Sequence, residues 1–258
     1  YNWDTESQSL VPSSKGESSY DENGNQILSI SYNWDTESQS LVPSSKGESS
    51  YDENGNRTLL IYYNWDTESQ SFVPNDKSES SYDENGNLTL RIDYRWDTES
   101  QSLVLYRKSE SSYDENGNRI LYTSYNWDRE SQSFVPNDKS ESSYDENGNR
   151  TLYTIYNWDL ESQSLVLYRK YEYSYDENGN KTLEIQYRWD PESQSFVLYR
   201  KYGKSYDENG NLTFWISITW DLESQSPKGQ IKRESSYDEN GNLTLRIDYR
   251  WDTESQSL

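Results

Sequence analysis

The stretch Gln26-Ile27-Leu28-Ser29-Ile30-Ser31-Tyr32-Asn33-Trp34 decides the fold class of this chain. Every second residue from Leu28 to Trp34 is apolar or aromatic, and polar residues fill the positions between them. Alternation with a period of two is typical of a half-buried β-strand, because successive side chains point to opposite faces. The same alternation recurs at 59–65, 90–96 and 183–189. The sequence therefore predicts a recurring strand with one apolar and one polar face.

The chain is an uninterrupted tandem repeat with a period of 31 residues. Trp stands at nine equivalent positions, which are predicted to form a structural ladder: Trp3, Trp34, Trp65, Trp96, Trp127, Trp158, Trp189, Trp220 and Trp251. Each Trp is followed by Asp and, one residue later, by Glu-Ser-Gln-Ser. A fixed period of this length indicates a stacked array in which every repeat has the same fold and the same place relative to its neighbours.

A second strand is clearest at 165–175, where Tyr171, Tyr173 and Tyr175 alternate with charged or polar residues. A Lys recurs in this strand in every complete repeat, usually with a Glu two residues later, which favours an ion pair on one face of the strand. These lysines are Lys15, Lys46, Lys77, Lys108, Lys139, Lys170, Lys201 and Lys232. An exposed pair of this kind contributes little, about 0–1 kcal/mol.

The segment Asp-Glu-Asn-Gly-Asn links this second strand to the next first strand. Asn-Gly between alternating segments is a strong hairpin signal, because both residues tolerate positive φ. The turn residues are Asn23, Gly24, Asn54, Gly55, Asn85, Gly86, Asn116, Gly117, Asn147, Gly148, Asn178, Gly179, Asn209, Gly210, Asn240 and Gly241. With a longer turn at Asp-x-Glu-Ser-Gln-Ser, the prediction is an all-β array of 31-residue hairpins. We expect an extended, twisted antiparallel sheet or superhelix.

Proline inside the second strand supports an alternative architecture. Pro12, Pro43, Pro74 and Pro136 each remove a ladder donor, so the strand could bulge or break into a third turn. Each repeat would then be one coil of a parallel β-solenoid. Disorder is the other alternative, because net charge is high and aliphatic residues are few. The 39 aromatic residues on a strict lattice favour an ordered array.

Composition excludes several classes of function. The chain has 24 Lys+Arg against 46 Asp+Glu, a net charge of −22 and a pI near 4.3, which disfavours binding to nucleic acid. It has no Cys and no His, so disulfides, zinc–thiolate sites and the commonest general base are absent. No apolar run is long enough for a membrane span. We expect a protein that is not an enzyme.

The organisation predicted from the repeats is a single array over residues 1–258, eight repeats of 31 residues plus 10. Neither end carries a polar capping repeat, which solenoids usually need. The expectation is a window from a longer array or a processed piece of one. A piece cut at convenient sites is the alternative.

The pattern Tyr-Asp-Glu-Asn-Gly-Asn followed by an alternating strand resembles the YD repeats of Rhs-type and teneurin-like shells. With Tyr-x-Trp-Asp and the recurrent Lys, the chain looks more like YD-like tandem repeats of secreted or surface-anchored bacterial proteins. The resemblance covers the whole chain, although the period of 31 is longer than the usual YD unit. It implies an extracellular, non-catalytic array of spiralling antiparallel sheet.

Two carboxylate patterns are candidate sites. Asp21, Asn23 and Asn25, with counterparts in each repeat, place hard oxygen ligands at alternate positions, as in a Ca²⁺ loop. The Gly stands at position four instead of six, and no Glu follows at position twelve, so a structural turn is the preferred interpretation and no cofactor is expected. Asp35 and Glu37 resemble a glycosidase pair, but repetition in register favours a structural role.

Aromatic residues offer a candidate carbohydrate site. The Trp and Tyr columns could stack on sugars, but their regular spacing favours a core ladder. The aromatic residues outside the lattice are Tyr62, Tyr122, Tyr153 and Trp215 beside Phe214. Candidate glycosylation sequons begin at Asn56, Asn87, Asn149, Asn180, Asn211 and Asn242. The run 222–233 departs from the consensus and is either drift or a local interaction site.

The function predicted from the sequence is that of a non-catalytic structural repeat protein of an extracellular fibre, stalk or cell-surface array. The alternative is a carbohydrate-binding adhesin module that uses repeated aromatic grooves. Self-association or a second chain is expected to cover the apolar face, because a large apolar surface does not stay in water.

Overall fold

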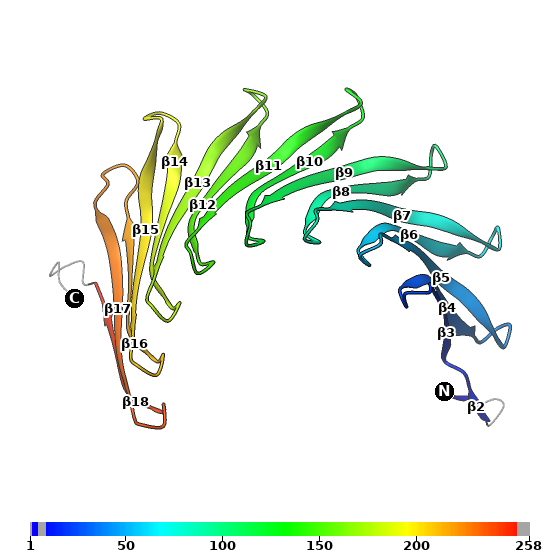
Figure 1. Ribbon diagram of the computed structural model, residues 1–258, viewed down its shortest axis with the longest axis horizontal. Helices are drawn as coiled ribbons and strands as arrows, with labels where there is room; N and C mark the ends of the chain where they lie inside the picture. Colours follow the sequence, from blue (N-terminus) through cyan, green and yellow to red (C-terminus); the bar gives the residue numbers. More distant parts are fainter. Residues whose placement is uncertain (1, 5–8, 252–258) are drawn as a thin grey trace. The chain divides into compact units, whose positions relative to one another are not determined.

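The computed structural model describes residues 2–4 and 9–251, with side chains described for residue 10 and residues 12–251. Its contacts divide the chain into two units. Unit 1 comprises residues 1–111 and 124–135, and unit 2 comprises residues 112–123 and 136–258. Each unit consists of antiparallel hairpins, as the labelled strands show (Figure 1).

The strands alternate between a first strand that ends at the Trp-Asp pair and a second strand that ends at the Tyr of Tyr-Asp. Unit 1 contains β1 (Asn2–Asp4), β2 (Ser9–Val11), β3 (Ser14–Tyr20), β4 (Gln26–Asp35), β5 (Ser40–Tyr51), β6 (Arg57–Asp66), β7 (Ser71–Tyr82) and β8 (Leu88–Asp97). The strands with residues in both units are β9 (Ser102–Tyr113), β10 (Arg119–Asp128) and β11 (Ser133–Tyr144). Unit 2 contains β12 (Arg150–Asp159), β13 (Ser164–Tyr175), β14 (Lys181–Asp190), β15 (Ser195–Tyr206), β16 (Leu212–Trp220), β17 (Pro227–Tyr237) and β18 (Leu243–Arg250).

The strand pairing confirms the predicted hairpin array. In both units neighbouring strands from β3 to β18 pair in sequence order and run antiparallel, and β1 and β2 form a separate antiparallel pair. Because every described pairing joins consecutive strands, the parallel β-solenoid is excluded. Among the described residues no helix is long and apolar enough to cross a membrane.

Proline is accommodated without breaking the second strand. In β7, Pro74 pairs with Tyr63 and Asp76 pairs with Tyr62, which leaves Asn75 as the extra residue of a β-bulge. A bulge interrupts the hydrogen-bond ladder locally, so proline beside it removes no essential donor. The same bulge occurs opposite Tyr156, where no proline is present. Of the two predicted effects of proline, the structure has the bulge, and the alternative third turn is absent from β5, β7 and β11.

The first and last repeats differ from this pattern. Pro12 lies between β2 and β3, so the second strand is interrupted there. In the divergent run 222–233, Trp220 pairs with Pro227 and Thr219 with Gly229, which makes Lys228 the extra residue. The substitutions in this run therefore move the bulge along the strand, and the strand itself is kept.

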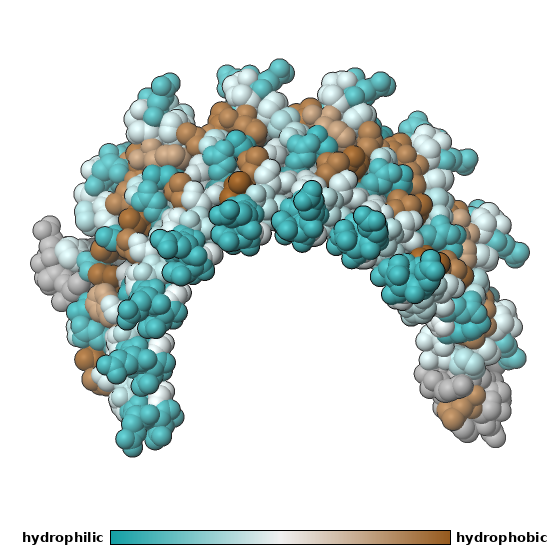
Figure 2. Space-filling model, in the orientation of Figure 1, coloured by the Kyte–Doolittle hydropathy of each residue, from teal (hydrophilic) through white to brown (hydrophobic). Residues whose placement is uncertain are grey.

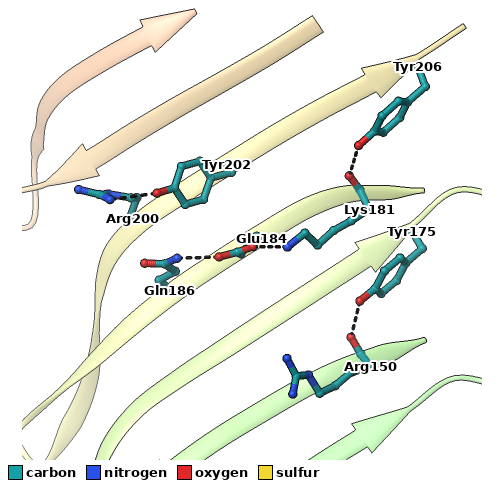
Figure 3. A network of polar contacts seen from close by, with 8 residues as sticks. All are labelled: Arg150, Tyr175, Lys181, Glu184, Gln186, Arg200, Tyr202 and Tyr206. Carbon is teal, nitrogen blue, oxygen red and sulfur yellow. Dashed lines mark hydrogen bonds and ion pairs between the residues drawn. The ribbon is translucent and has the colours of Figure 1, made fainter. Parts of the chain in front are cut away.

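The Tyr of each Tyr-Asp motif fastens one hairpin to the preceding one. Tyr82 Oη donates a hydrogen bond to the carbonyl oxygen of Arg57 at 3.0 Å. Figure 3 shows the equivalent bonds from Tyr175 to Arg150 and from Tyr206 to Lys181. The same bond is made by Tyr51, Tyr144 and Tyr237. This link between repeats explains why the motif carries Tyr and not another aromatic residue.

The sheet has no enclosed apolar core. None of the described apolar side chains is buried, and the buried side chains are small polar ones such as Ser124 and Thr154. Figure 2 shows hydrophilic residues gathered at the hairpin ends, with apolar residues between them over the strands. Order therefore comes from backbone pairing, cross-strand side-chain contacts and the turns.

Candidate functional site

The face of the sheet that carries the Trp residues has nearly the same side chains in every repeat, and we call it the ladder face. In β6 it presents Leu59, Ile61, Tyr63 and Trp65, which pair with residues of both neighbouring strands. The second strands add Lys and Glu to this face, because Lys77 pairs with Ile61. The predicted apolar face is therefore interleaved with charged side chains.

A three-residue contact between Lys, Glu and Tyr recurs along the ladder face, and we call it the ladder triad. Lys77 Nζ lies 2.6 Å from Glu79 Oε1 and 4.6 Å from the centre of the Tyr94 ring. Tyr94 Oη donates to Glu79 Oε2 at 2.8 Å. Equivalent triads are Lys15–Glu17–Tyr32, Lys46–Glu48–Tyr63, Lys108–Glu110–Tyr125, Lys139–Glu141–Tyr156, Lys170–Glu172–Tyr187 and Lys232–Glu234–Tyr249. The predicted same-face Lys–Glu pair thus gains a tyrosine that the sequence pattern did not reveal.

The triad shifts the ionisation of its members. The hydrogen bond from Lys77 lowers the pKa of Glu79, and the bond from Tyr94 adds to the effect. Burial and the bond to Glu79 raise the pKa of Tyr94 to about 12. The other ladder tyrosines with a pKa of about 12 are Tyr63, Tyr156 and Tyr187. At neutral pH the carboxylate is therefore ionised and the phenol protonated, as the hydrogen bond requires.

The predicted Trp ladder lies at the end of each first strand on the ladder face. Trp65 meets Phe72 edge to face, with ring centres 5.0 Å apart, and Trp127 and Trp189 meet Phe134 and Phe196 similarly. The described Trp side chains of the ladder are half-buried. The side chain of Trp3 lies outside the described residues.

The predicted turn segment Asp-Glu-Asn-Gly-Asn forms a five-residue loop between the strands. Gly86 N donates to Asp83 O at 3.0 Å, and Asp83 N donates to Asn87 O at 3.0 Å. Within the loop only the Gly has positive φ, +80° at Gly86, although Asn also tolerates such a φ. Asn85 instead donates its backbone N–H to the Asp83 carboxylate. The loop is a type I turn followed by a glycine bulge.

Asp and Asn side chains of the turn bind one another. The Asp83 carboxylate accepts the backbone N–H of Asn87 at 2.8 Å and its side-chain Nδ2 at 3.0 Å. The side-chain bond to Asn87 contributes most to lowering the pKa of Asp83. The alternating Asp and Asn that resemble a Ca²⁺ loop thus serve the turn, and the sequon Asn binds through the nitrogen that a glycan would occupy. The described residues contain no cluster of three acidic, His or Cys side chains arranged for a metal.

The second turn uses its carboxylate in the same way. Asp35 accepts backbone N–H groups from Glu37 at 3.4 Å and from Ser38 at 3.0 Å. Gln39 adopts φ of +49° there, a conformation repeated at the six equivalent glutamines Gln70, Gln101, Gln132, Gln163, Gln194 and Gln225. The candidate catalytic pair Asp35 and Glu37 therefore lies in an exposed structural turn.

The opposite face differs from repeat to repeat, and we call it the variable face. In β14 it carries Glu184, Gln186 and Arg188, which alternate with the ladder residues. The position of Trp215 is occupied in other repeats by Ser29, Leu60, Arg91, Tyr122, Tyr153, Glu184 and Arg246. The position of Gln186 is occupied by Ser31, Tyr62, Asp93, Ser124, Ile155, Ser217 and Asp248. By contrast, the Trp and the Lys of the ladder face never change.

The variable face of unit 2 contains a hollow over β14, β15 and β16. Its volume is about 230 Å³, and its lining includes Glu184, Gln186, Tyr202, Lys204 and Trp215. The rings of Tyr202 and Trp215 are 6.4 Å apart at 33°. Figure 3 shows four of the lining residues, Lys181, Glu184, Gln186 and Tyr202. This is the candidate functional site, because aromatic and polar groups converge in it.

Polar contacts hold the wall of the hollow in place. Glu184 accepts hydrogen bonds from Lys181 and from Gln186 Nε2, and Arg200 Nη1 donates to Tyr202 Oη at 2.9 Å (Figure 3). Burial alone would raise the pKa of Glu184, but the bonds from Lys181 and Gln186 outweigh it and lower the pKa. The carboxylate therefore stays ionised inside the hollow.

More aromatic residues extend the site along the variable face. Tyr153 and Tyr171 have ring centres 6.0 Å apart, and Tyr171 stacks on Tyr173 at 6.3 Å. Arg150 lies 4.4 Å from the ring of Tyr153. Burial is the main reason that the pKa of Tyr173 rises to about 12. We call Tyr153, Tyr171, Tyr173, Tyr202 and Trp215 the aromatic band.

The four candidate aromatic residues that stand outside the repeat pattern have different surroundings in the structure. Trp215 and Tyr153 belong to the aromatic band, whereas Tyr122 contacts Arg119 at 4.7 Å. Tyr62 lies in unit 1 with 38% of its surface exposed. Sequence reasoning missed Tyr171, Tyr173 and Tyr202 as site residues. The residue type at these three positions differs between repeats, and this variation is the sequence signal that identifies them.

Comparisons with known proteins give structural likenesses only. A scan against protein-family models finds no match, and a search of curated proteins finds none. The chain is similar to a protein of unknown function from Bacteroides fragilis (20% identity, 49% of this chain and 89% of that chain, TM-score 0.39). It is also similar to a DUF3836 family protein from Parabacteroides distasonis (16% identity, 45% and 91%, TM-score 0.27). A further likeness is to the Tc holotoxin pore of Photorhabdus luminescens (12% identity, 94% and 16%, TM-score 0.32). At these TM-scores the likenesses give no basis for assigning a function.

Proposed function

We propose that the chain is a non-catalytic structural repeat protein of an extracellular fibre, stalk or cell-surface array. The observation that supports this most directly is the recurrence of one set of contacts in nearly every repeat. The ladder triad, the Tyr–carbonyl bond between hairpins and both turns recur with the period of 31 residues. Along the described strands from β3 to β18 each hairpin pairs with the hairpins next to it in sequence, so the same unit can be added without changing the rest.

The non-catalytic part of the proposal rests on how the carboxylates are used. A pair of catalytic carboxylates needs two different environments that separate their pKa values. Here Asp35 accepts hydrogen bonds within its own turn, and the same arrangement recurs at Asp66 and Asp128. A hydrolytic activity that one carboxylate substitution abolishes would overturn the proposal.

We also propose that the repeats are YD-like and that a second sheet or chain covers the ladder face. The Tyr-Asp motif supports the first point, because its Tyr joins hairpins and its Asp organises the turn. The half-buried state of the ladder residues supports the second, because further contact would remove apolar surface from water.

Electron microscopy of native material from the producing cells tests the structural role. We expect fibres or stalks with an axial repeat of about 10 Å, the width of two strands, or a multiple of it. Protease treatment of intact cells should release the repeats if they are extracellular. Short discrete particles, or protection from protease until lysis, would contradict the proposal.

Carbohydrate binding is a second candidate function, and one observation favours it. The hollow at Tyr202 and Trp215 combines aromatic faces with Gln186 and Glu184 as hydrogen-bonding groups. Sugar sites in proteins combine these elements.

A further inference from the structure

The negative charge of the chain is concentrated away from the variable face. Each repeat places two carboxylates in each of its two turns, and nearly every repeat places one more in the ladder triad. These groups account for most of the 46 Asp+Glu residues. On the variable face of β12 to β16, the acidic residue is Glu184. The cations there are Arg150, Arg169, Lys181, Arg188, Arg200 and Lys204. A strongly acidic protein therefore has a locally cationic surface in unit 2.

Most of these cations are held by tyrosines and not by carboxylates. Arg188 lies 3.9 Å from the ring of Tyr199, and Arg169 Nη2 donates to Tyr168 Oη at 3.0 Å. Among the described ion pairs, that of Lys181 with Glu184 alone involves one of these six cations. Stacking on an aromatic face orients a guanidinium without neutralising its charge. The positive charge thus stays available to an anionic ligand.

The hollow supplies the remaining chemistry of a binding site. Trp215 and Tyr202 offer apolar ring faces, and Lys204 is an ammonium group without an ion pair among the described residues. Glu184 and Gln186 offer groups that accept hydrogen bonds from hydroxyls. A ligand that satisfies all of these has flat apolar faces, several hydroxyl donors and a negative charge. Pyranose rings that carry a carboxylate have this combination.

We propose that the aromatic band and the hollow bind an acidic polysaccharide of the uronate class. The chain of sugars would run across the strands, with rings against the aromatic band and carboxylates toward Lys204 and the arginines. A phosphate backbone fits less well, because its oxygens accept but do not donate hydrogen bonds and so cannot bind Glu184 as sugar hydroxyls can. The inference rests on the proposed scaffold function in one respect, because the ladder face and turns must hold the variable face in place.

Binding of the full chain to three immobilised oligomers tests the proposal: oligoguluronate, an uncharged cello-oligosaccharide of equal length and oligo-dT. Variants Trp215→Ser and Lys204→Ser introduce the residue found at the equivalent position of other repeats, Ser29 and Ser49, so the strands should be preserved. Leu60→Ser is the matched control, because Leu60 occupies the position of Trp215 in a repeat of unit 1. Circular dichroism of each variant checks folding.

We expect binding to oligoguluronate that weakens as salt increases and exceeds binding to the neutral oligosaccharide. Trp215→Ser and Lys204→Ser should each weaken it by about ten-fold, equal to about 1.4 kcal/mol, and Leu60→Ser should leave it unchanged. No binding to oligoguluronate, or equal binding by all folded variants, would overturn the proposal. Tighter binding to oligo-dT, lost in the same variants, would replace it with a nucleic-acid site. None of these binding results changes whether electron microscopy shows fibres or stalks, so the proposed structural role is tested separately.

Discussion

The ladder triad makes a measurable prediction about stability. Glu79→Ala removes both the ion pair with Lys77 at 2.6 Å and the acceptor of the Tyr94 hydrogen bond at 2.8 Å. Tyr94→Phe removes the hydrogen bond and keeps the ring below Lys77. The two substitutions and their combination form a double-mutant cycle, which isolates the Glu79–Tyr94 interaction.

The expected magnitude follows from the exposure of the groups. A buried hydrogen bond to a charged acceptor contributes about 1.5–3 kcal/mol. The Glu79 side chain is 41% exposed, so we reduce that value to about 1 kcal/mol. The ion pair, with Lys77 24% exposed, adds at most about 0.5 kcal/mol. Glu79→Ala should therefore lower the free energy of unfolding by about 1.5 kcal/mol, with a coupling energy to Tyr94→Phe of about 1 kcal/mol.

The coupling should also depend on pH at both ends of the scale. The pKa of Glu79 is lowered in the folded chain, so its contribution is present above its ordinary value of 4.5 and is lost as pH falls through the lower folded value. The pKa of Tyr94 is raised to about 12 from 10, so its contribution is present below pH 10 and is lost as pH rises toward 12.

Urea unfolding, together with amide hydrogen exchange in β7 and β8, measures the effect globally and locally. Tyr62→Phe is the control, because Tyr62 lies on the variable face and is 38% exposed, and it should change neither readout. A coupling energy within about 0.3 kcal/mol of zero at neutral pH would refute the reasoning, as would a coupling that does not change between pH 10 and 12.

Three further predictions concern the turns, the Trp ladder and the ladder tyrosines. Gly86→Ala should lower the free energy of unfolding by about 1 kcal/mol in urea, because φ is +80°; Gly16→Ala, which meets no atom within 4 Å, is the control, and equal effects would argue against this reason. Phe72→Leu should cost about 1 kcal/mol and alter Trp fluorescence, because it removes the edge-to-face contact with Trp65; an unchanged spectrum would count against that contact. The four ladder tyrosines should ionise near pH 12, which ultraviolet absorbance of tyrosinate measures, and the free energy of unfolding should fall from pH 10 to 12. A single titration near pH 10 would show that burial and the bond to Glu do not keep these phenols protonated.

The fold class could be predicted because it depends on local patterns. The alternation from Leu28 to Trp34 and the Gly of the Asn-Gly turn each constrain a few neighbouring residues, and the period of 31 repeats these constraints. The turn segment Asp-Glu-Asn-Gly-Asn was predicted, but the sequence did not reveal the backbone bonds of Asp83 to Gly86 and to Asn87 that close the loop. Asn tolerates positive φ but does not have to adopt it. Asn85 keeps negative φ, and its backbone N–H donates a hydrogen bond to the Asp83 carboxylate.

The candidate site could be predicted only in part. Trp215 and Tyr153 were recognisable because they stand outside the lattice, but Tyr202 and Lys204 look like ordinary residues of a second strand. Their convergence with Trp215 depends on the register of β15 against β16, where Lys204 pairs with Trp215. A shift of one residue would move them to the other face.

The sequence by itself determined the repeat, the strand alternation, the positions of the turns and the excess of negative charge. These are properties of short segments, and each follows from the residues within a few positions of one another. The tertiary structure alone decided which side chains of neighbouring strands meet. Cross-strand pairing brought Lys77 over Tyr94 and left the arginines of unit 2 on tyrosines opposite the ladder. The reason is physical: register joins side chains that are distant in the sequence, such as Glu79 and Tyr94, and the bulges that set it are not encoded by any single residue type.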